Sequence, residues 1–206
     1  MKLYYAKGAC SLAVRIIIHE MSIACEYEAV NLRSKKTERG TDFLTINPKG
    51  AVPVLVLDNK EILTENVVIL QYLAEKYHAE HLLPSVGDIK RYHVLEWLNF
   101  ITTDLHKTCS PLFNPQLPEK VRNEIFIPLL KSKLDLVNNH LQHNKYLMGE
   151  QFTLADPYLF VILSWLTHFK LALSDWSHSS RYFKELLQRD SVRQALTEEN
   201  LIGKNI

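Results

Sequence analysis

Cys10 is the residue whose type and position point most directly to chemistry. It lies in a turn of small residues between a predicted strand, Lys2 to Tyr5, and a predicted helix, Ser11 to Glu20. Backbone N–H groups and the helix dipole at such a position stabilise an anion, and they can lower the pKa of a thiol from ~8.5 into the range ~3.5–7.5. We therefore expect Cys10 to be a nucleophilic thiolate near neutral pH.

The neighbours of this thiol limit what it could do. The segment Cys10-Ser11-Leu12-Ala13 has no second cysteine, unlike the Cys-x-x-Cys of thioredoxin-like redox sites, so Cys10 could form a mixed disulfide but could not close a local one. Cys25 precedes a strand without a recognisable anion site. Cys109 ends a predicted helix, where the dipole disfavours a thiolate. Cys10 is thus expected to react first.

Two further segments could bind a peptide-like ligand. In Asn47-Pro48-Lys49-Gly50-Ala51-Val52-Pro53, a cis bond before Pro53 would present the main chain of Val52 to a ligand backbone, although an ordinary edge strand is the simpler reading. Thr64-Glu65-Asn66 begins a predicted helix, where free N–H groups could receive a carboxylate and Glu65 could attract an amine. Plain helix capping is the alternative for this segment.

A long predicted helix carries the third group of polar residues. Asn99, Thr103 and His106 are spaced i, i+4 and i+7, which would place them in one stripe ~10 Å long, the scale of a tripeptide. His106 titrates near neutral pH and could orient a thiol or accept its proton. An exposed polar stripe without a ligand is the alternative.

The elements that must position these residues divide the chain into two halves. The first half is predicted as β-α-β, a loop and β-β-α, with strands over 2–5, 27–32, 52–57 and 61–63, and a second helix capped by Thr64 that ends near Tyr77. A linker follows over 78–88. Apolar residues at helical spacing predict only helices beyond it, over 89–108, 121–143, 154–169, 181–188 and 192–196. The predicted fold class is α/β plus all-α, with domains 1–80 and 88–206.

Composition excludes several classes of function. The 206 residues carry 24 Lys+Arg against 23 Asp+Glu, a net charge of +1, which gives no field to attract nucleic acid or an anionic membrane. No apolar stretch approaches the ~20 residues of a membrane span. The three cysteines fit no disulfide framework, as in a reducing cytoplasm. The pairs His140/His143 and His78/His81 lack clustered ligands, so we predict no metal.

Together these motifs resemble the glutathione transferase family, and its bacterial, cysteine-bearing beta class most of all. The resemblance rests on the turn with Cys10, on the segment 47–53 and on Leu63-Thr64-Glu65-Asn66. It continues in Glu96-Trp97-Leu98-Asn99, Leu105-His106-Lys107 and Phe152-Thr153-Leu154-Ala155-Asp156. The resemblance implies a thioredoxin-like domain followed by a helical domain, with glutathione bound between them.

The resemblance also implies roles for individual residues. Val52 would pair its main chain with the cysteinyl part of glutathione, Glu65 and Asn66 would hold the γ-glutamyl end, and Lys35 would balance the glycyl carboxylate. Asn99 would belong to the polar stripe that faces the thiol. The segment Thr103, Asp104, Leu105 and His106 would border the ligand, with Asp104 reaching across a homodimer interface. Ser11 and His106 would rival Cys10 as the group that activates the thiol.

The implied activity is conjugation of reduced glutathione, a co-substrate rather than a tightly bound cofactor, to small hydrophobic electrophiles. Thiol-disulfide exchange through Cys10 would share the site. A glutathione-dependent disulfide or peroxide reductase and a non-catalytic carrier of hydrophobic ligands are the alternatives. We expect the electrophile near Leu112, Phe113, Trp165 and His168. The capping box from Thr153 to Asp156 is interpreted as structural.

Overall fold

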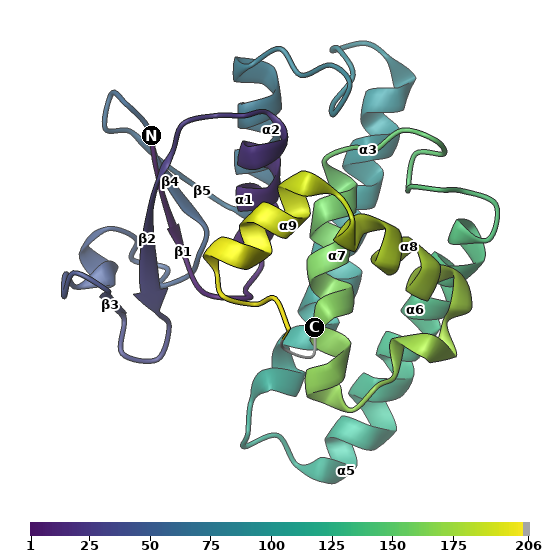
Figure 1. Ribbon diagram of the computed structural model, residues 1–206. Helices are drawn as coiled ribbons and strands as arrows, with labels where there is room; N and C mark the ends of the chain where they lie inside the picture. The colour runs from purple at the N-terminus through teal and green to yellow at the C-terminus, as the bar shows by residue number, and fades with distance from the viewer. Residues whose placement is uncertain (204–206) are drawn as a thin grey trace.

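The computed structural model describes residues 1–203 and divides into a small sheet with two helices and a larger helical part (Figure 1). The sheet has the order β3-β2-β1-β4-β5. β1 (Lys2–Tyr5) is parallel to β2 (Glu26–Asn31), and β4 (Val54–Val56) is antiparallel both to β1 and to β5 (Ile62–Thr64). This mixed sheet confirms the predicted thioredoxin-like half. The predicted strand that began at Val52 begins instead at Val54, after Pro53, which has no N–H to donate to the sheet.

Two helices cover the sheet. They are α1 (Ser11–Glu20) and α2 (Asn66–Lys76), and a two-residue strand, β3 (Lys36–Thr37), and a short 3₁₀ turn, η1 (Phe43–Thr45), lie in the connection between β2 and β4. Every side chain from Ser11 to Ile18 is buried, because α1 contacts the helical half as well as the sheet. Thr64 is not the N-cap of α2, since the strand β5 includes it and Glu65 takes that position.

The helical half begins at Ile89, after the predicted linker. Its first long helix is α3 (Ile89–Phe100), which continues without a break through a π-helical segment, η2 (Ile101–His106), and α4 (Lys107–Cys109) into a 3₁₀ turn, η3 (Ser110–Phe113). The remaining elements are α5 (Glu119–Val121), π-helical η4 (Arg122–Phe126), α6 (Ile127–Leu141), α7 (Ala155–Ser164), 3₁₀ η5 (Trp165–Phe169), 3₁₀ η6 (Leu173–Asp175), α8 (Ser177–Leu187) and α9 (Asp190–Glu198). The helices were therefore predicted in the correct order, with interruptions that helical periodicity did not show.

The helix α7 is the centre of the helical half. All ten of its residues are buried, and it contacts α1, α3 and α8. Its first turn is organised by Asp156, which accepts hydrogen bonds from the Thr153 and Leu147 backbone N–H groups and from the Tyr182 hydroxyl. The Thr153 hydroxyl bonds to the Asp156 carboxylate instead of capping a backbone N–H. The motif therefore serves folding, as interpreted from the sequence.

The last helix ties the ends of the chain together. α9 packs along α1, as Figure 1 shows, and the residue after it, Glu199, accepts a hydrogen bond of 2.8 Å from the Gly8 N–H. The indole of Trp165, the first residue of η5, donates a hydrogen bond of 2.8 Å to the Gly8 carbonyl. The turn that leads to Cys10 is thus held on both sides by the helical half. None of the helices among residues 1–203 is long and apolar enough to cross a membrane.

Candidate active site

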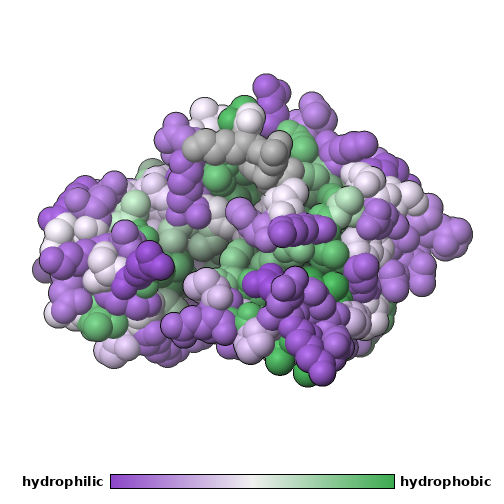
Figure 2. All heavy atoms as spheres, turned by 90° about the horizontal axis from the view of Figure 1, so that it is seen from below, coloured by the Kyte–Doolittle hydropathy of each residue, from purple (hydrophilic) through white to green (hydrophobic). Residues whose placement is uncertain are grey.

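A cleft of about 880 Å³ lies where the two halves meet. In the view of Figure 2, green apolar residues lie between the smaller and the larger part of the molecule, with hydrophilic residues around them. The first half contributes Cys10, Lys35, Val52, Glu65 and Asn66 to the lining, and the helical half contributes His106 with an aromatic wall. Six of the predicted site residues therefore share one cleft.

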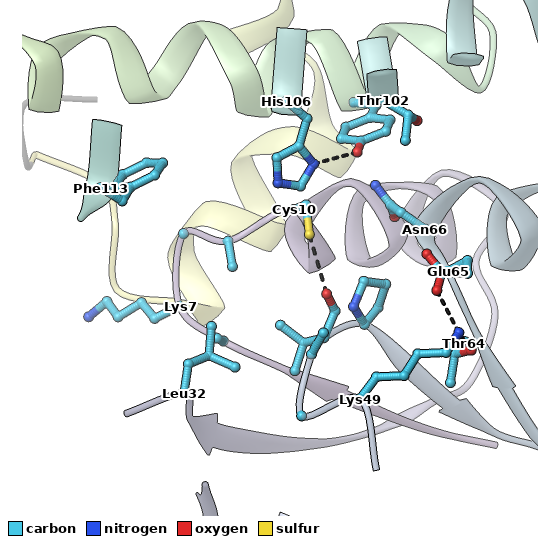
Figure 3. Close-up of a pocket in the computed structure, with 18 of the residues that line it drawn as sticks. Lys7, Cys10, Leu32, Lys49, Thr64, Glu65, Asn66, Thr102, His106 and Phe113 are labelled. Carbon is cyan, nitrogen blue, oxygen red and sulfur yellow. Dashed lines mark hydrogen bonds and ion pairs between the residues drawn. The ribbon is translucent and has the colours of Figure 1, made fainter. Parts of the chain in front are cut away.

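Cys10 occupies the N-cap position of α1, as expected, but its ionisation differs from the prediction. Its Sγ lies 3.3 Å from the Val52 carbonyl oxygen, to which the thiol donates (Figure 3). Burial raises the pKa of the Cys10 thiol to about 12, although the backbone N–H groups of Cys10 and Ser11 act in the opposite direction. The prediction of a thiolate near neutral pH is wrong for this arrangement, because desolvation outweighs the helix N-terminus.

Ser11 does not reach the cleft. Its side chain is fully buried beneath Cys10, and its hydroxyl lies 3.2 Å from the Ala6 N–H and 3.3 Å from the Ala6 carbonyl. Both contacts stay within the turn that joins β1 to α1. Ser11 therefore fixes this turn, and its predicted role as a thiol-activating group is not supported, since the hydroxyl points into the protein.

Val52 and Lys35 lie in the part of the cleft formed by the first half. The Val52–Pro53 peptide bond is cis, which was one of the two possibilities left open from the sequence, the other being an ordinary edge strand. The Lys35 Nζ donates a hydrogen bond of 2.7 Å to the Gly50 carbonyl. Gly50 has a φ of +61°, and a Cβ there would come within 3.3 Å of Lys35 Nζ and 3.1 Å of Leu44. A glycine at this position is what lets the lysine lie against the loop.

Glu65 and Asn66 form the polar end of the cleft. Glu65 has a φ of 71°, which a non-glycine residue adopts at a cost of order 1–3 kcal/mol, and its carboxylate pairs with Lys49 at 2.6 Å. Asn66 is only 7% exposed, and within the described residues neither its amide nitrogen nor its amide oxygen has a hydrogen-bond partner. Figure 3 shows its nitrogen directed toward the space between Cys10 and His106. A buried, unpaired amide at a cleft is equipped to bind a polar ligand.

His106 is the central residue of the opposite wall. Its Nδ1 lies 2.6 Å from the Tyr158 hydroxyl, and its ring packs edge-on against Trp165 with the ring centroids 4.9 Å apart. Burial lowers the pKa of His106 to about 4, and the charge of Lys107 contributes. The imidazole is therefore neutral at neutral pH.

The predicted stripe with His106 does not exist in this chain. A π-helix has wider turns than an α-helix, so η2 carries His106 out of line with Asn99 and Thr103, which are exposed elsewhere, and Thr102 lines the cleft in their place. Leu105 is fully buried in the core. Asp104 pairs with Lys133 at 2.6 Å. Asn99, Thr103, Asp104 and Leu105 were all predicted to bind the ligand, but none of them lines the cleft of its own chain.

The wall around His106 is aromatic. Phe113 stacks edge-on against Trp165 and Phe169 at centroid distances of 5.3 and 4.8 Å, and it lies 6.0 Å from the His168 ring. Phe113, Trp165 and His168 line the cleft, as predicted for the hydrophobic part. Leu112 is 3% exposed and belongs to the core instead. No group of three or more His, Cys, Asp or Glu side chains in the described chain could hold a metal ion.

Comparison with known proteins shows where this arrangement belongs. Residues 8–76 match the model of the glutathione S-transferase N-terminal domain, and residues 100–190 match that of the C-terminal domain. The chain is 42% identical to glutathione S-transferase GstA of Escherichia coli O157:H7 over 98% of its own length and all of that protein. It belongs to the glutathione S-transferase family.

Solved structures of bacterial transferases have the same fold. A beta-class glutathione S-transferase of Sphingomonas chungbukensis matches with a TM-score of 0.94 and 37% identity, and a sphingomonad glutathione S-transferase complexed with glutathione matches with 0.93 and 37%. Each comparison covers 98% of this transferase and the whole of the other chain. The predicted family and beta-class resemblance are thus confirmed.

Three of the residues that line the cleft, Lys49, Thr102 and Tyr158, were not predicted as site residues from the sequence. Lys49 was treated only as part of the segment 47–53, although its ammonium pairs with the Glu65 carboxylate. Thr102 was hidden by the assumption of an uninterrupted α-helix. Tyr158 lies in the apolar segment of α7, where a phenol must find a hydrogen-bond partner when buried, and this was the available signal.

Proposed function

We propose that the cleft binds glutathione with its γ-glutamyl end at Glu65 and Asn66. The observation that carries this proposal is the buried Asn66 amide, whose two polar atoms lack partners among the described residues. The Glu65 carboxylate beside it would attract the γ-glutamyl amine, and the free N–H groups at the start of α2 would receive the γ-glutamyl carboxylate. Both ends of an amino acid would thus be recognised at one helix terminus.

The rest of the tripeptide would follow the first half of the chain. The cysteinyl part would pair with the main chain of Val52, and Lys35 would balance the glycyl carboxylate. This course would place the glutathione sulfur near Cys10 and His106, which both line the cleft, with the Cys10 sulfur directed toward the Val52 carbonyl (Figure 3). The apolar wall of Phe113, Trp165 and His168 would receive a small hydrophobic electrophile beside the sulfur.

The proposed reaction is conjugation. The glutathione thiol loses its proton, the sulfur lone pair forms a bond to the electrophilic carbon, and in a substitution the leaving group departs with its bonding electrons. Cys10 at neutral pH is a thiol that donates a hydrogen bond, so we assign it a place beside the substrate sulfur. Of the three groups first considered for thiol activation, His106 has the position best suited to act on that sulfur.

Thiol-disulfide exchange is a second activity of the same cleft. The Cys10 sulfur would attack a glutathione disulfide, form a mixed disulfide and release one reduced glutathione. The high pKa of Cys10 makes this slow at neutral pH, whereas conjugation uses the thiol of the co-substrate. We therefore place conjugation first, before a predominant disulfide or peroxide reductase and before a ligand carrier.

Two assays separate these activities. Conjugation is followed with 1-chloro-2,4-dinitrobenzene and reduction with hydroxyethyl disulfide, each in the presence of glutathione. The proposal expects conjugation in the wild type, with reduction weaker and dependent on Cys10. Reduction without conjugation would favour a reductase, and glutathione binding without turnover in either assay would favour a carrier.

The binding mode has its own test. Glu65→Gln and Asn66→Ala should each weaken glutathione binding about tenfold, since a hydrogen bond to a charged group contributes about 1.5–3 kcal/mol. Glu61→Gln is the matched control, because Glu61 is exposed on the same hairpin and pairs with Asn59. Titration calorimetry measures the dissociation constants. Equal affinity in all four proteins would remove the γ-glutamyl assignment.

The remaining proposals concern the whole protein. We keep residues 1–80 and 88–206 as the extents of the two domains, a homodimer as the assembly, and the cytoplasm as the location. Glutathione is taken as a co-substrate, and no tightly bound cofactor forms part of the proposal.

A further inference from the structure

Tyr158 is a buried residue of the cleft to which the proposed binding mode gives no role. It lies on α7, is 1% exposed, and belongs to the lining of the cleft. Its phenol lies 2.6 Å from Nδ1 of His106, which is 52 residues earlier in the chain. A rigid central helix therefore reaches the histidine of the helical wall of the cleft.

The His106 ring is held from two sides by the same segment. The Tyr158 ring meets it at an interplanar angle of 90° with the centroids 5.9 Å apart, and the Trp165 ring meets it at 66° and 4.9 Å. Figure 3 shows the second ring nitrogen of His106, Nε2, directed away from the tyrosine and into the cleft. Rotation of the imidazole ring about the Cβ–Cγ bond of His106 would break the hydrogen bond to Tyr158.

The direction of the proton in this hydrogen bond can be argued from the neighbours. Thr102 donates its hydroxyl hydrogen to the Leu98 carbonyl at 2.8 Å, and Thr102 and Asn66 both act to lower the pKa of Tyr158, as side chains directed at a phenol oxygen do. The short contact of the Tyr158 hydroxyl, at 2.6 Å, is with Nδ1 of His106. Burial also raises the pKa of Tyr158 well above its ordinary value, so the phenol keeps its hydrogen.

The opposite arrangement would be less favourable. If Nδ1 carried the imidazole proton and donated it to the phenol oxygen, the weaker donor would meet the weaker acceptor, because a phenol O–H donates better than a neutral imidazole N–H and an imidazole nitrogen accepts better than a phenol oxygen. With the phenol as donor, both groups are satisfied and the imidazole proton resides on Nε2. The neutral imidazole then presents an N–H to the cleft rather than a lone pair.

We infer that Tyr158 is a positioning residue that fixes His106 as the Nε2–H tautomer, so that His106 donates a hydrogen bond to the glutathione sulfur instead of abstracting its proton. The inference rests on the proposed placement of glutathione. The thiol proton leaves to solvent, the proton on Nε2 stays on His106, and the N–H stabilises the thiolate until its lone pair forms the carbon–sulfur bond. Lys107 adds a positive charge near His106, and Cys10 lines the same cleft as a neutral thiol.

The first test reads the tautomer without substrate. Nitrogen NMR of histidine-labelled protein at pH 7 distinguishes a protonated from an unprotonated ring nitrogen, and His106→Gln assigns the signal. We expect Nε2–H in the wild type and a mixture of both tautomers in Tyr158→Phe. An Nδ1–H tautomer in the wild type would overturn the inference, whether or not glutathione binds.

The second test reads the consequence for the reaction. Loss of the fixed donor in Tyr158→Phe should lower kcat for conjugation about tenfold and raise the apparent pKa of kcat/KM by about one unit. The dissociation constant of glutathione should change less than about twofold, since the γ-glutamyl contacts remain. Failure of glutathione to bind the wild type would defeat the proposed function, whereas an unchanged pH profile with intact binding would overturn this inference.

Two further variants separate positioning from stability. His106→Gln keeps an N–H donor but offers no base, so it should retain more activity than His106→Ala, and Tyr158→Phe should add less than about a twofold effect to it. Tyr182→Phe is the matched control, because Tyr182 is a fully buried tyrosine whose hydroxyl serves Asp156. It should lower the melting temperature and leave the tautomer of His106 and the pH profile unchanged. Equal loss of activity in His106→Gln and His106→Ala would instead assign His106 as a base and overturn the inference.

Discussion

At the scale of single residues, Cys10 shows that position and burial can act in opposite directions on one thiol. Its place at the start of α1 was predictable from the sequence, and so was its presence in the cleft. Its ionisation was not, because burial depends on tertiary packing, and the carbonyl in contact with the sulfur belongs to Val52, far along the chain. The chemistry of a helix N-terminus therefore has to be judged together with what covers it.

The high pKa of Cys10 predicts how the thiol reacts with iodoacetamide. The thiolate is the reactive form, so alkylation of Cys10 should be slow at pH 7 and accelerate about tenfold for each pH unit up to pH 9. Cys109, which is fully buried and whose pKa burial raises to about 12, should stay unmodified in the folded protein. Peptide mass mapping measures both rates. A rate at Cys10 that levels off below pH 8 would contradict this prediction.

A related prediction concerns oxidised glutathione. Cys10 lies in the cleft, whereas Cys25 and Cys109 do not line it. Mild treatment should therefore place the glutathionyl group on Cys10 first. Cys10→Ala should abolish the adduct and most disulfide reduction, while conjugation continues with His106 in place. Undiminished disulfide reduction in Cys10→Ala, or an adduct that forms first on Cys109, would disprove the assignment.

At the scale of elements, the ends of the helical segments decide what the cleft accepts. Phe113 at the end of η3 and Trp165 at the start of η5 form one aromatic wall, and Phe113 is 48% exposed. Phe113→Leu should raise the KM for a hydrophobic electrophile about fivefold, since an aromatic contact contributes about 1 kcal/mol, and leave the glutathione KM within about twofold. Phe126→Leu, outside the cleft, is the control. Steady-state kinetics with each substrate varied measures both constants.

Trp165 should behave differently, since its indole also bonds to Gly8. Trp165→Ala should still raise the electrophile KM more than the glutathione KM, but the turn that leads to Cys10 should loosen as well. Equal changes in the two constants would mean that Trp165 serves the core. The comparison with Phe113→Leu separates the aromatic wall from the support of the turn.

The helical elements also show where sequence reasoning fails. Val94, Leu98, Ile101 and Leu105 predicted the buried face of the long helix, and all four are buried. The same periodicity could not reveal η2, because apolar spacing does not distinguish a π-turn from an α-turn over a few residues. The polar residues on the opposite face were therefore misplaced. Tyr158 was missed for a related reason, since its partner is remote in the sequence.

At the scale of the whole molecule, the two halves are joined by a charged contact outside the cleft. Glu20 at the end of α1 accepts hydrogen bonds from Arg189 and from the Ser191 hydroxyl, the latter at 2.6 Å. Burial acts to raise the pKa of Glu20, but these two partners outweigh it and hold the pKa below its ordinary value. The stabilisation is thus complete above the ordinary pKa of a glutamate and is lost as the pH falls through the lowered value.

Removal of this charge should destabilise the protein. Glu20→Gln should lower the free energy of unfolding at pH 7 by about 2 kcal/mol, the scale of a charge-assisted hydrogen bond. The difference from the wild type should shrink at acid pH, where Glu20 is protonated in both states. Denaturant unfolding at several pH values measures this, with the exposed Glu150→Gln as control. A difference independent of pH would argue for packing rather than charge.

Assembly is the remaining prediction at this scale. We expect a homodimer in which Asp104 approaches the ligand of the partner subunit, as the resemblance to the family implies. Sedimentation at micromolar concentration measures the state of assembly. A strictly monomeric protein that binds glutathione normally would refute a shared site.

The two hydrogen bonds that hold Gly8 have a consequence for protein engineering. The turn before Cys10 takes its support from Trp165 and Glu199, both in the helical half. A chimera that joins this sheet domain to another helical domain would therefore exchange more than an electrophile pocket. It would also re-aim the cysteine, so specificity and thiol geometry would be inherited together from whichever parent supplies the C-terminal part.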